Sequence, residues 1–453
     1  MQFNSIYIGD NMEESTGKRI LNLAIPATIE NLLQTLVGFV DTLLIAKIGL
    51  MAVTAVGVAN TILNVYLAIF IALGVGTSSL IAQKLGAKDR AGAVRIAEQS
   101  TFSAVIIGLL FGLLTLTFGK PLLGLMGAAD QVMAYSTAFF YIVGGNSVFL
   151  AVMTIFGSIL RASGNTKSPM QVSVIVNVLN VGLDYILIFG IGPIPALGVV
   201  GTAIGTTVAR MLGCVLLYKQ IKKSPVSFEL KSIFVKSDYA PLVRLSIPAA
   251  LERLVMRVGQ VVYFGLIVAI GAKTFAAHSI AGNIESFVYM PAYGLATAAT
   301  TLVGNSTGAL DFKEAKRVAI LSAAFGVHIM SFLGIILFVG SPYFAELFTS
   351  DAEAIDQIVT ALRIDAFNQP GLAISLITTG SLQGMGDTKS PLYSTAFGMW
   401  CLRIIGVILL GRVLGWGIAG VWISIGIDLY VRSLFLAYRF RKNISDRSVA
   451  APE

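Results

Sequence analysis

The chain has 453 residues, of which 56% are hydrophobic and only 12% are charged, and its mean hydropathy is +0.82. A soluble domain of this length could not present so much apolar surface to water, so the composition predicts a membrane protein. A formal charge of +8 and a pI near 9.4 do not indicate nucleic-acid binding, because the basic residues follow the pattern of membrane loops. The first 17 residues lack the layout of a signal peptide.

Apolar runs of about 20 residues, each long enough to cross a hydrocarbon core of about 30 Å, recur along the whole chain. The sequence predicts an all-α membrane protein with twelve transmembrane helices. Cys214 and Cys401 both lie within expected helices, so no disulfide framework is expected. The expected helices begin near Ile25, Ala52, Gly92, Gln131, Lys167, Ala196, Pro241, Thr274, Lys316, Ala354, Thr388 and Gly417.

The loops between these helices differ in charge. Most of the 32 Lys and Arg residues lie at the two ends of the chain and in the loops after every second helix. Only Lys47, Lys120, Lys273 and Arg412 lie in the opposite loops. Basic loops stay on the cytoplasmic side, so both termini are expected to be cytoplasmic in a multi-pass protein of the plasma membrane.

The chain repeats itself at an offset of 222 residues. The string GNTKSP at 164–169 returns as GDTKSP at 386–391, and IPATIENL at 25–32 returns as IPAALERL at 247–254. GAKDRAGAVRIA at 86–97 matches GALDFKEAKRVA at 308–319. Two parallel six-helix bundles related by a pseudo-two-fold axis along the membrane normal are therefore expected. The predicted parts are a cytoplasmic tail (1–17), an N-terminal lobe (18–218), a basic cytoplasmic linker (219–240), a C-terminal lobe (241–441) and a cytoplasmic tail (442–453).

The duplicated string is predicted to join the fourth and fifth helices of each half on the cytoplasmic side. Thr166 and Thr388 are candidate helix caps, and Pro169 and Pro391 fall in the first turn, where a missing N–H costs nothing. A phosphate-binding loop is rejected because the Gly does not directly precede the Lys and no strand leads in. The longest hydrophilic stretch is too short for an ATPase domain, so any transport must use an ion gradient.

These motifs together resemble the multidrug and toxic compound extrusion (MATE) transporters. The resemblance rests on the two IPA…E helix starts, the duplicated loop, and a glycine–aspartate run in the first helix at Gly38, Asp41, Thr42 and Gly49. It is most similar to the branch of the DNA-damage-inducible F protein, of archaeal type. The resemblance implies a V-shaped pair of lobes, acting as a monomer, that exports amphipathic, mostly cationic drugs or toxic organic compounds in exchange for H⁺ or Na⁺. It implies no other cofactor.

A second likeness concerns the loop after the second expected helix. GAKDRAGAVR, after the second expected helix, resembles the major-facilitator loop G-x-x-x-D-R-x-G-R-R, which occupies the same place in another twelve-helix fold. The acidic residue comes one position early and the second basic pair is reduced to Arg95, so the major-facilitator fold remains the alternative.

Four oxygen-bearing side chains are expected at one depth of the N-terminal lobe: Asp41, Asn180, Asp184 and Thr202. Charged groups inside a bilayer are costly, and carboxylate, amide and hydroxyl oxygens suit Na⁺ or a proton relay. The corresponding positions in the second half are occupied by Tyr263, Leu402 and Gly406, so this cation-coupling site is expected only once. The family resemblance points to the same residues.

Polar stripes on the first and fifth helices predict a substrate cavity in the N-terminal lobe, lined by Gln34, Asp41, Asn177 and Asn180. Two methionines that suit varied flat rings are added as candidates, Met153 and Met256. Pro26 and Gly38 weaken the first helix and are predicted to let it bend, which would expel the drug once cations neutralise the aspartates.

A second candidate cation site comprises Glu252, Glu285 and Asp365 in the C-terminal lobe, where Arg253 and Arg363 could neutralise two of the acids. Glu30 and Glu252 occupy matching positions, and structural ion pairs are favoured for both.

The rival functions come from other classes. A flippase or exporter of lipid-linked or anionic lipid-like substrates is kept open by five arginines within the expected spans: Arg210, Arg253, Arg257, Arg403 and Arg432. An enzyme is not expected, because His278 and His328 belong to no metal-spacing or catalytic motif.

Overall fold

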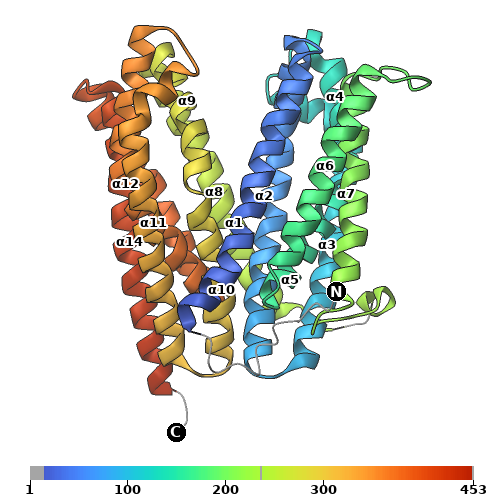
Figure 1. Cartoon of the computed structure of the whole chain (residues 1–453), viewed down its shortest axis with the longest axis vertical. Helices are drawn as coiled ribbons and strands as arrows, with labels where there is room; N and C mark the ends of the chain where they lie inside the picture. Colours follow the sequence, from blue (N-terminus) through green and yellow to red (C-terminus); the bar gives the residue numbers. More distant parts are fainter. Residues whose placement is uncertain (1–14, 235–236, 451–453) are drawn as a thin grey trace. The chain divides into compact units, whose positions relative to one another are not determined.

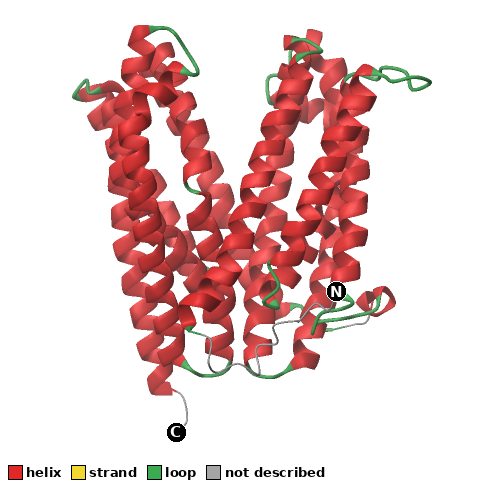
Figure 2. Cartoon of the chain, in the orientation of Figure 1, coloured by secondary structure: helices red, strands yellow, loops and turns green. Residues whose placement is uncertain are grey.

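The computed structural model describes residues 15–234 and 237–450, and these residues form helices joined by short loops, without a strand (Figure 2). Residues 1–14 of the expected cytoplasmic tail (1–17) lie outside the described residues. The first helix starts at Thr16, within the last part of that expected tail. The helices of the first half are α1 (Thr16–Ala46), α2 (Leu50–Gly86), α3 (Arg90–Leu125), α4 (Asp130–Gly145), α5 (Ser147–Ala162), α6 (Lys167–Phe189) and α7 (Val199–Ile221).

A short 3₁₀ turn, η1 (Leu230–Phe234), lies in the basic linker. The second half contains α8 (Ala240–Ile270), α9 (Ala272–Val288), α10 (Met290–Gly308), α11 (Phe312–Glu346), α12 (Ala352–Gly384), α13 (Lys389–Phe397), the π-helical turns η2 (Gly398–Ile404) and η3 (Val407–Val413), and α14 (Gly417–Ala450). The stretch 442–450, expected as a tail, continues α14.

The helices match the expected membrane protein. Nine described segments are long and apolar enough to cross a bilayer, and α4 and α5 form a tenth as a pair bent by 47°. The more polar α9–α10 pair and α12 complete the twelve expected segments, and α12 packs against α10, α11 and α14. The fourth and eighth segments are therefore broken helices, and π turns interrupt the eleventh.

The described residues fall into two compact units (Figure 1). The N-terminal unit comprises Ile29–Ile81 and Asp89–Ala250, and the C-terminal unit comprises the described parts of Met1–Thr28, Ala82–Lys88 and Leu251–Glu453. The helices α1, α2 and α8 thus each contribute to both units. The units divide after Thr28 in α1 and after Ala250 in α8, positions that are 222 residues apart, as in the sequence repeat. Each division lies two residues after a proline within the helix, Pro26 in α1 and Pro248 in α8.

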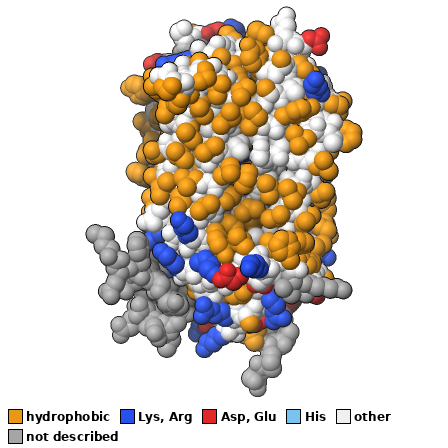
Figure 3. Space-filling model, turned by 90° about the vertical axis from the view of Figure 1, so that its right-hand side faces the viewer, with side chains coloured by type: hydrophobic (Ala, Val, Ile, Leu, Met, Phe, Trp, Pro, Cys, Tyr) orange, Lys and Arg blue, Asp and Glu red, His pale blue; other side chains and the backbone are white. Residues whose placement is uncertain are grey.

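The N-terminal unit packs α3 against α4 and α5, and α6 against α7. Tyr66 stacks on Phe111 with ring centroids 4.5 Å apart, and its hydroxyl lies 3.0 Å from Thr115 Oγ1. Figure 3 shows the outer face of this unit as a broad apolar surface, with Lys and Arg gathered at one end. The apolar surface includes exposed Val178 and Val215, and exposed Lys222 and Lys223 follow the end of α7. An apolar band with a basic margin is typical of a protein surface in a bilayer.

The C-terminal unit is built around α12, which contacts α9, α10, α11 and α14. Small residues allow these close contacts. A Cβ atom added to Gly334 of α11 would lie only 2.7 Å from the Ala366 carbonyl oxygen of α12, so no larger residue fits there. Trp422 of α14 is 1% exposed and belongs to a buried apolar cluster with Tyr263 and Met399.

The sequence repeat recurs as repeated local structure. Asp89 caps α3 by accepting from Gly92 N at 2.8 Å, and Asp311 caps α11 by accepting from Glu314 N at 2.9 Å. The residue before each aspartate has φ of 59°, and Gly164 and Gly386 both have φ of 83°. Only glycine adopts this left-handed conformation without cost, which explains both glycines of the duplicated string.

The predicted caps of the duplicated string are wrong. Neither Thr166 nor Thr388 makes a side-chain cap, although both are buried. The preceding residue does so instead: Asn165 Oδ1 accepts from Ser168 N at 3.0 Å, and Asp387 Oδ1 accepts from Ser390 N at 2.9 Å. The Oδ1 atom of a side chain one position earlier reaches the N–H three residues on, as in an ordinary N-terminal cap.

Candidate functional site

The four residues predicted to couple a cation lie in the N-terminal unit. Asp41 is on α1, Asn180 and Asp184 are one turn apart on α6, and Thr202 is at the start of α7. Asn180 Nδ2 donates to Asp184 Oδ1 at 3.3 Å. The carboxyl groups of Asp41 and Asp184 interact electrostatically. Two ionised carboxylates that interact in this way repel each other, so a proton or a cation at either carboxyl would stabilise the pair.

The helix α7 closes this site from the other side. A Cβ atom on Gly205 would overlap Asp184 Oδ1, so the missing side chain leaves the space that the carboxyl group occupies. Thr202 precedes Gly205 by three residues, which puts its side chain on the same face of the helix. Asp184 is fully buried and Thr202 is 2% exposed. Asp184 is therefore enclosed, whereas Asp41 is half-buried with its Oδ1 atom inside the protein.

Three oxygens of this site have no hydrogen-bond donor within the described part of the chain: Asp41 Oδ1, Asp184 Oδ2 and Thr202 Oγ1. Buried polar atoms in proteins nearly always have a partner. A set of carboxylate, carboxamide and hydroxyl oxygens is what a hard monovalent cation such as Na⁺ binds, and the same carboxyls can hold a proton. The residues present thus fit both coupling ions that the sequence predicted.

The MatE family matches residues 26–186 and 248–409, which together are well over half of the chain. The chain belongs to the MatE family. Membership of this family of transporters confirms a multi-pass membrane transport protein and rules out the predicted alternative of a major-facilitator fold. The loop that suggested that alternative is the N-terminal cap of α3.

Relatives of this MatE chain include a probable multidrug resistance protein NorM of Thermotoga maritima, which is 30% identical over 425 residues, covering 92% of this chain and 90% of that protein. An uncharacterized transporter YisQ of Bacillus subtilis is 29% identical over 428 residues, 94% of each chain. Among solved structures, a MOP superfamily transporter from Pyrococcus furiosus aligns with a TM-score of 0.89 at 24% identity, over 96% of this chain and 97% of that one. The fold is therefore the MATE fold.

Arg210 of α7 interacts electrostatically with Asp41 of the aspartate pair. Within residues 15–234 and 237–450, Arg210 forms no ion pair and no hydrogen bond. Asp41 is therefore not locked to an arginine. A positive charge close by still weakens binding of a cation at Asp41.

The predicted cavity residues of the MatE chain are only partly brought together. Asn177 donates to Ser173 Oγ at 3.3 Å along its own helix, and Gln34 is exposed on α1. Met153 of α5 packs against Gly213 of α7. The contact is so close that a Cβ atom added to Gly213 would lie 2.8 Å from the Met153 Sδ atom. Met256 belongs to the C-terminal unit, where it packs against the core around Trp422. Met153 therefore fills space between two helices.

The first helix of the MatE chain runs from Thr16 to Ala46 with Pro26 inside it, and a Cβ on Gly38 would touch nothing. One turn after Pro26, Glu30 is 7% exposed and is paired with Arg161 of α5. Arg161 Nη1 donates to both Glu30 oxygens, at 2.9 and 3.2 Å. The predicted structural ion pair for Glu30 is confirmed. Its partner was missed because 131 residues separate the two side chains in sequence.

The second candidate cation site of the MatE chain differs from its prediction. Glu252 accepts a hydrogen bond from Thr395 Oγ1 at 3.1 Å and has no ion pair among the described residues, so the predicted pair is wrong for Glu252. Asp365 is fully buried, accepts from Gln369 Nε2 at 2.6 Å and interacts electrostatically with Glu285. Arg363 does not neutralise these acids: its guanidinium lies over the Phe338 ring, 5.3 Å from the centroid. Consecutive helical residues point to different faces, which explains the error.

A buried charge cluster of the MatE chain was missed altogether. Asp428 of α14 is fully buried, and Arg403 Nη2 and Arg432 Nη2 approach its Oδ2 at 2.8 and 2.7 Å. Arg403 comes from the π-helical turn η2, and a Cβ on Gly398 of the same turn would overlap Asp428. Arg432 follows Asp428 by four residues in an apolar span, and this spacing was the one signal in the sequence.

Proposed function

We propose that this transporter is an efflux antiporter that exports amphipathic, mostly cationic organic compounds in exchange for H⁺ or Na⁺. The coupling ion binds at Asp41, Asn180, Asp184 and Thr202, and the protein acts as a monomer in the cell membrane with both termini in the cytoplasm. The observation that carries the proposal is the set of three buried oxygens, on Asp41, Asp184 and Thr202, that have no hydrogen-bond partner among the described residues. The electrostatic interaction between the two carboxyls supports it. The relatives named as multidrug resistance proteins support the class of substrate.

The cycle follows from charge exclusion. With Asp41 and Asp184 free of cations, the cavity is electronegative and attracts a lipophilic cation. Entry of H⁺ or Na⁺ neutralises the pair and removes that attraction, and the drug leaves. One elementary charge descending 100 mV supplies about 2.3 kcal/mol, which corresponds to a tenfold to hundredfold change in affinity. Bending of α1 near Pro26 and Gly38 would then fill the vacated volume.

The C-terminal acids are a weaker candidate for coupling. Asp365 already receives a short hydrogen bond from Gln369, and Glu252 receives one from Thr395. Glu285 interacts with the guanidinium of Arg403, which offsets its charge. The N-terminal site has the greater number of unbonded oxygens close together, so we place coupling there.

The alternative function is export of lipid-linked or anionic lipid-like substrates, which needs unpaired cations in the cavity. Arg403 and Arg432 are held by Asp428, and Arg257 donates to Gln260 Oε1 at 3.3 Å. Of the five arginines that kept this alternative open, Arg210 is the one in the N-terminal unit. The observation that favours the alternative is that Arg210 has no ion pair among the described residues.

The test is ethidium efflux from proteoliposomes under an imposed pH gradient, and separately under an imposed Na⁺ gradient. Asp41→Asn and Asp184→Asn should abolish gradient-driven efflux, while Asp130→Asn, an exposed aspartate at the start of α4, should leave it intact. The gradient that drives the wild-type protein identifies the ion. Wild-type efflux by both site variants would refute coupling at this pair, and transport of an anionic lipid analogue with no ethidium efflux would favour the alternative.

A further inference from the structure

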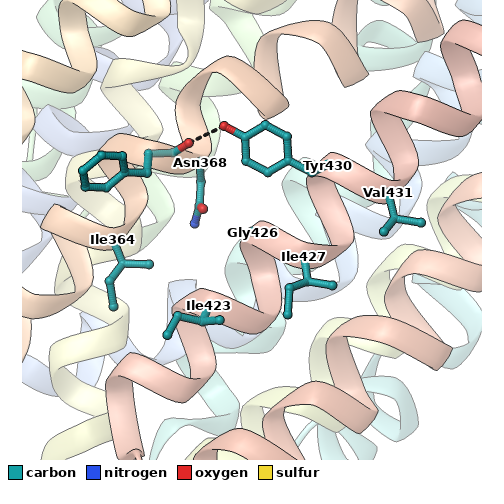
Figure 4. Close-up of a pocket in the computed structure, with 8 residues that line it drawn as sticks. Ile364, Asn368, Ile423, Gly426, Ile427, Tyr430 and Val431 are labelled. Atoms are coloured by element: carbon teal, nitrogen blue, oxygen red, sulfur yellow. Dashed lines mark hydrogen bonds between the residues drawn. The ribbon is translucent and has the colours of Figure 1, made fainter.

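We propose that a groove between α12 and α14 of the C-terminal unit binds one phospholipid molecule, with an acyl chain in the groove and the phosphate on Arg363. Figure 4 shows the groove between the two helices. Its volume is about 480 Å³, within the range of about 300–1,000 Å³ that is typical of ligand pockets. Its apolar lining includes Ile364 and Phe367 of α12 and Ile423, Ile427 and Val431 of α14.

The groove offers a ligand mainly hydrocarbon, and each of its two polar side chains donates a hydrogen bond to a backbone carbonyl. Tyr430 donates its hydroxyl proton to the Phe367 carbonyl at 2.5 Å, which is the dashed line in Figure 4. Asn368 Nδ2 donates to the Trp422 carbonyl at 3.1 Å. A drug-like ligand with several polar groups would find few partners here, whereas an acyl chain needs none.

The groove is a property of the helix contact itself. A Cβ atom on Gly426 of α14 would overlap Asn368 Oδ1, so the two helices approach closely at this level. On the same side Gly371 of α12 lies under the Tyr430 ring, with its Cβ position 3.1 Å from the ring. The larger apolar residues that line the groove lie before and after Gly426 in α14.

A positive charge lies beside the groove. Arg363 precedes Phe367 by four residues on α12, so both side chains lie on one face of the helix. The Arg363 guanidinium lies 5.3 Å from the Phe338 ring centroid, and Phe338 meets Phe367 edge-on at 5.9 Å. Arg363 is exposed, and in the described part of the chain it has neither an ion pair nor a hydrogen bond. Its guanidinium donors are thus available to an outside acceptor.

The position of Arg363 suits a lipid headgroup. It lies 11 residues into α12, about 16 Å from the start of the helix at 1.5 Å per residue. Helical side chains lean toward the N-terminus, so this arginine extends toward the nearer membrane surface and its charge reaches the headgroup layer. A guanidinium binds phosphate through two parallel hydrogen bonds, which places the attached acyl chains beside the groove one turn deeper.

Native mass spectrometry of the full-length protein, titrated with phosphatidylglycerol, tests the site. The wild-type protein should retain one lipid molecule, and diacylglycerol with the same chains should bind about tenfold more weakly because it lacks the phosphate. Arg363→Gln should weaken phosphatidylglycerol retention by about tenfold, while Arg363→Lys should retain part of it. Val431→Trp should fill the groove and lower the retention of both lipids.

Two matched variants control for general effects. Arg412→Gln removes another exposed arginine, and Leu434→Trp adds the same indole to α14 at an exposed residue that does not line the groove. Both should retain phosphatidylglycerol as the wild-type protein does. Equal retention by Arg363→Gln and wild type, equal binding of diacylglycerol, or a dimer in the spectrum that Val431→Trp dissociates would each overturn the proposal. The last result would assign the groove to a second copy of the chain.

Discussion

Gly205 of α7 lies directly against the carboxyl group of Asp184 of α6, so that a Cβ atom at position 205 would overlap Asp184 Oδ1. Gly205→Ala should therefore displace one of the two proposed coupling carboxyls without changing any charge. A displacement of about 1 Å in a site of this kind can cost a hundredfold in rate, and we expect gradient-driven ethidium efflux to fall by about tenfold to hundredfold. Gly182→Ala on α6, where a Cβ would touch nothing, is the matched control and should transport normally.

Pro26→Ala tests the bending of α1. Proline removes one backbone hydrogen bond and distorts a helix at a cost of about 3 kcal/mol, so alanine should favour the straight helix. The turnover rate should fall while ethidium affinity stays near that of the wild-type protein, as measured by efflux kinetics and equilibrium fluorescence. Pro248→Ala, at the matching position of α8, tests whether the effect belongs to α1 alone. An unchanged turnover in Pro26→Ala would reject the bending model.

Breaking the ion pair between Arg161 and Glu30 should destabilise the N-terminal unit. Arg161→Met leaves the Glu30 carboxylate buried without its cation, which typically costs about 3–5 kcal/mol. The double variant Arg161→Met/Glu30→Gln removes both charges and should recover most of the loss. Thermal unfolding of the detergent-solubilised protein measures this, and the pair is unimportant if the single variant unfolds at the wild-type temperature.

The cluster of Arg403, Asp428 and Arg432 makes a similar prediction for the C-terminal unit. Asp428→Asn leaves two guanidinium groups facing each other in a buried setting, and we expect a loss of about 3–5 kcal/mol in unfolding free energy. Asp356→Asn, an exposed aspartate on α12, should have no measurable effect in the same unfolding experiment. Equal unfolding curves for the two variants would contradict a structural role for the cluster.

The loop before α12 predicts a dependence on acid pH. Lys273 donates to Asp351 and holds the pKa of that exposed carboxyl below its usual value. A carboxyl with a lowered folded-state pKa stabilises the protein above its unfolded pKa of about 3.9, and this stabilisation is lost as the pH falls through the folded-state pKa. Asp351 also caps α12, accepting from Glu353 N at 2.9 Å. Asp351→Asn should keep the cap and flatten the acid side of the unfolding curve, measured between about pH 5 and pH 3.

The residues of the proposed N-terminal cation site could be singled out in the sequence because charge in a bilayer is rare. Asp41 and Asp184 stood out in apolar spans, and the one-turn spacing of Asn180 and Asp184 fixed a common face. The same reasoning failed for Glu252 and Arg363, because neighbouring residues in sequence were taken as neighbours in space. The side chain of Arg363 points to Phe338 on another helix, and no periodicity within α12 could indicate that.

The duplicated string illustrates the same limit at a turn. Its glycines were correctly placed, since only glycine accepts a φ of 83° without strain. The cap was assigned one residue too late, because Asn165 and Thr166 are both capping residues and the choice depends on where the helix starts. The helices α1 and α8 each contribute to both units, dividing after Thr28 and after Ala250. The sequence repeat did not indicate this, because two separate six-helix bundles would show the same repeat.

The sequence by itself determined the class of protein, the number of crossings and the duplication, since hydropathy, loop charge and internal repeats are read along one dimension. Only the tertiary structure decided which charged groups pair: Glu30 with Arg161, 131 positions apart, and Asp428 with Arg403, 25 positions apart on another helix. In an apolar medium a charged group is stable only beside its partner, and that partner is chosen by how the helices pack, which the periodicity within one helix does not show.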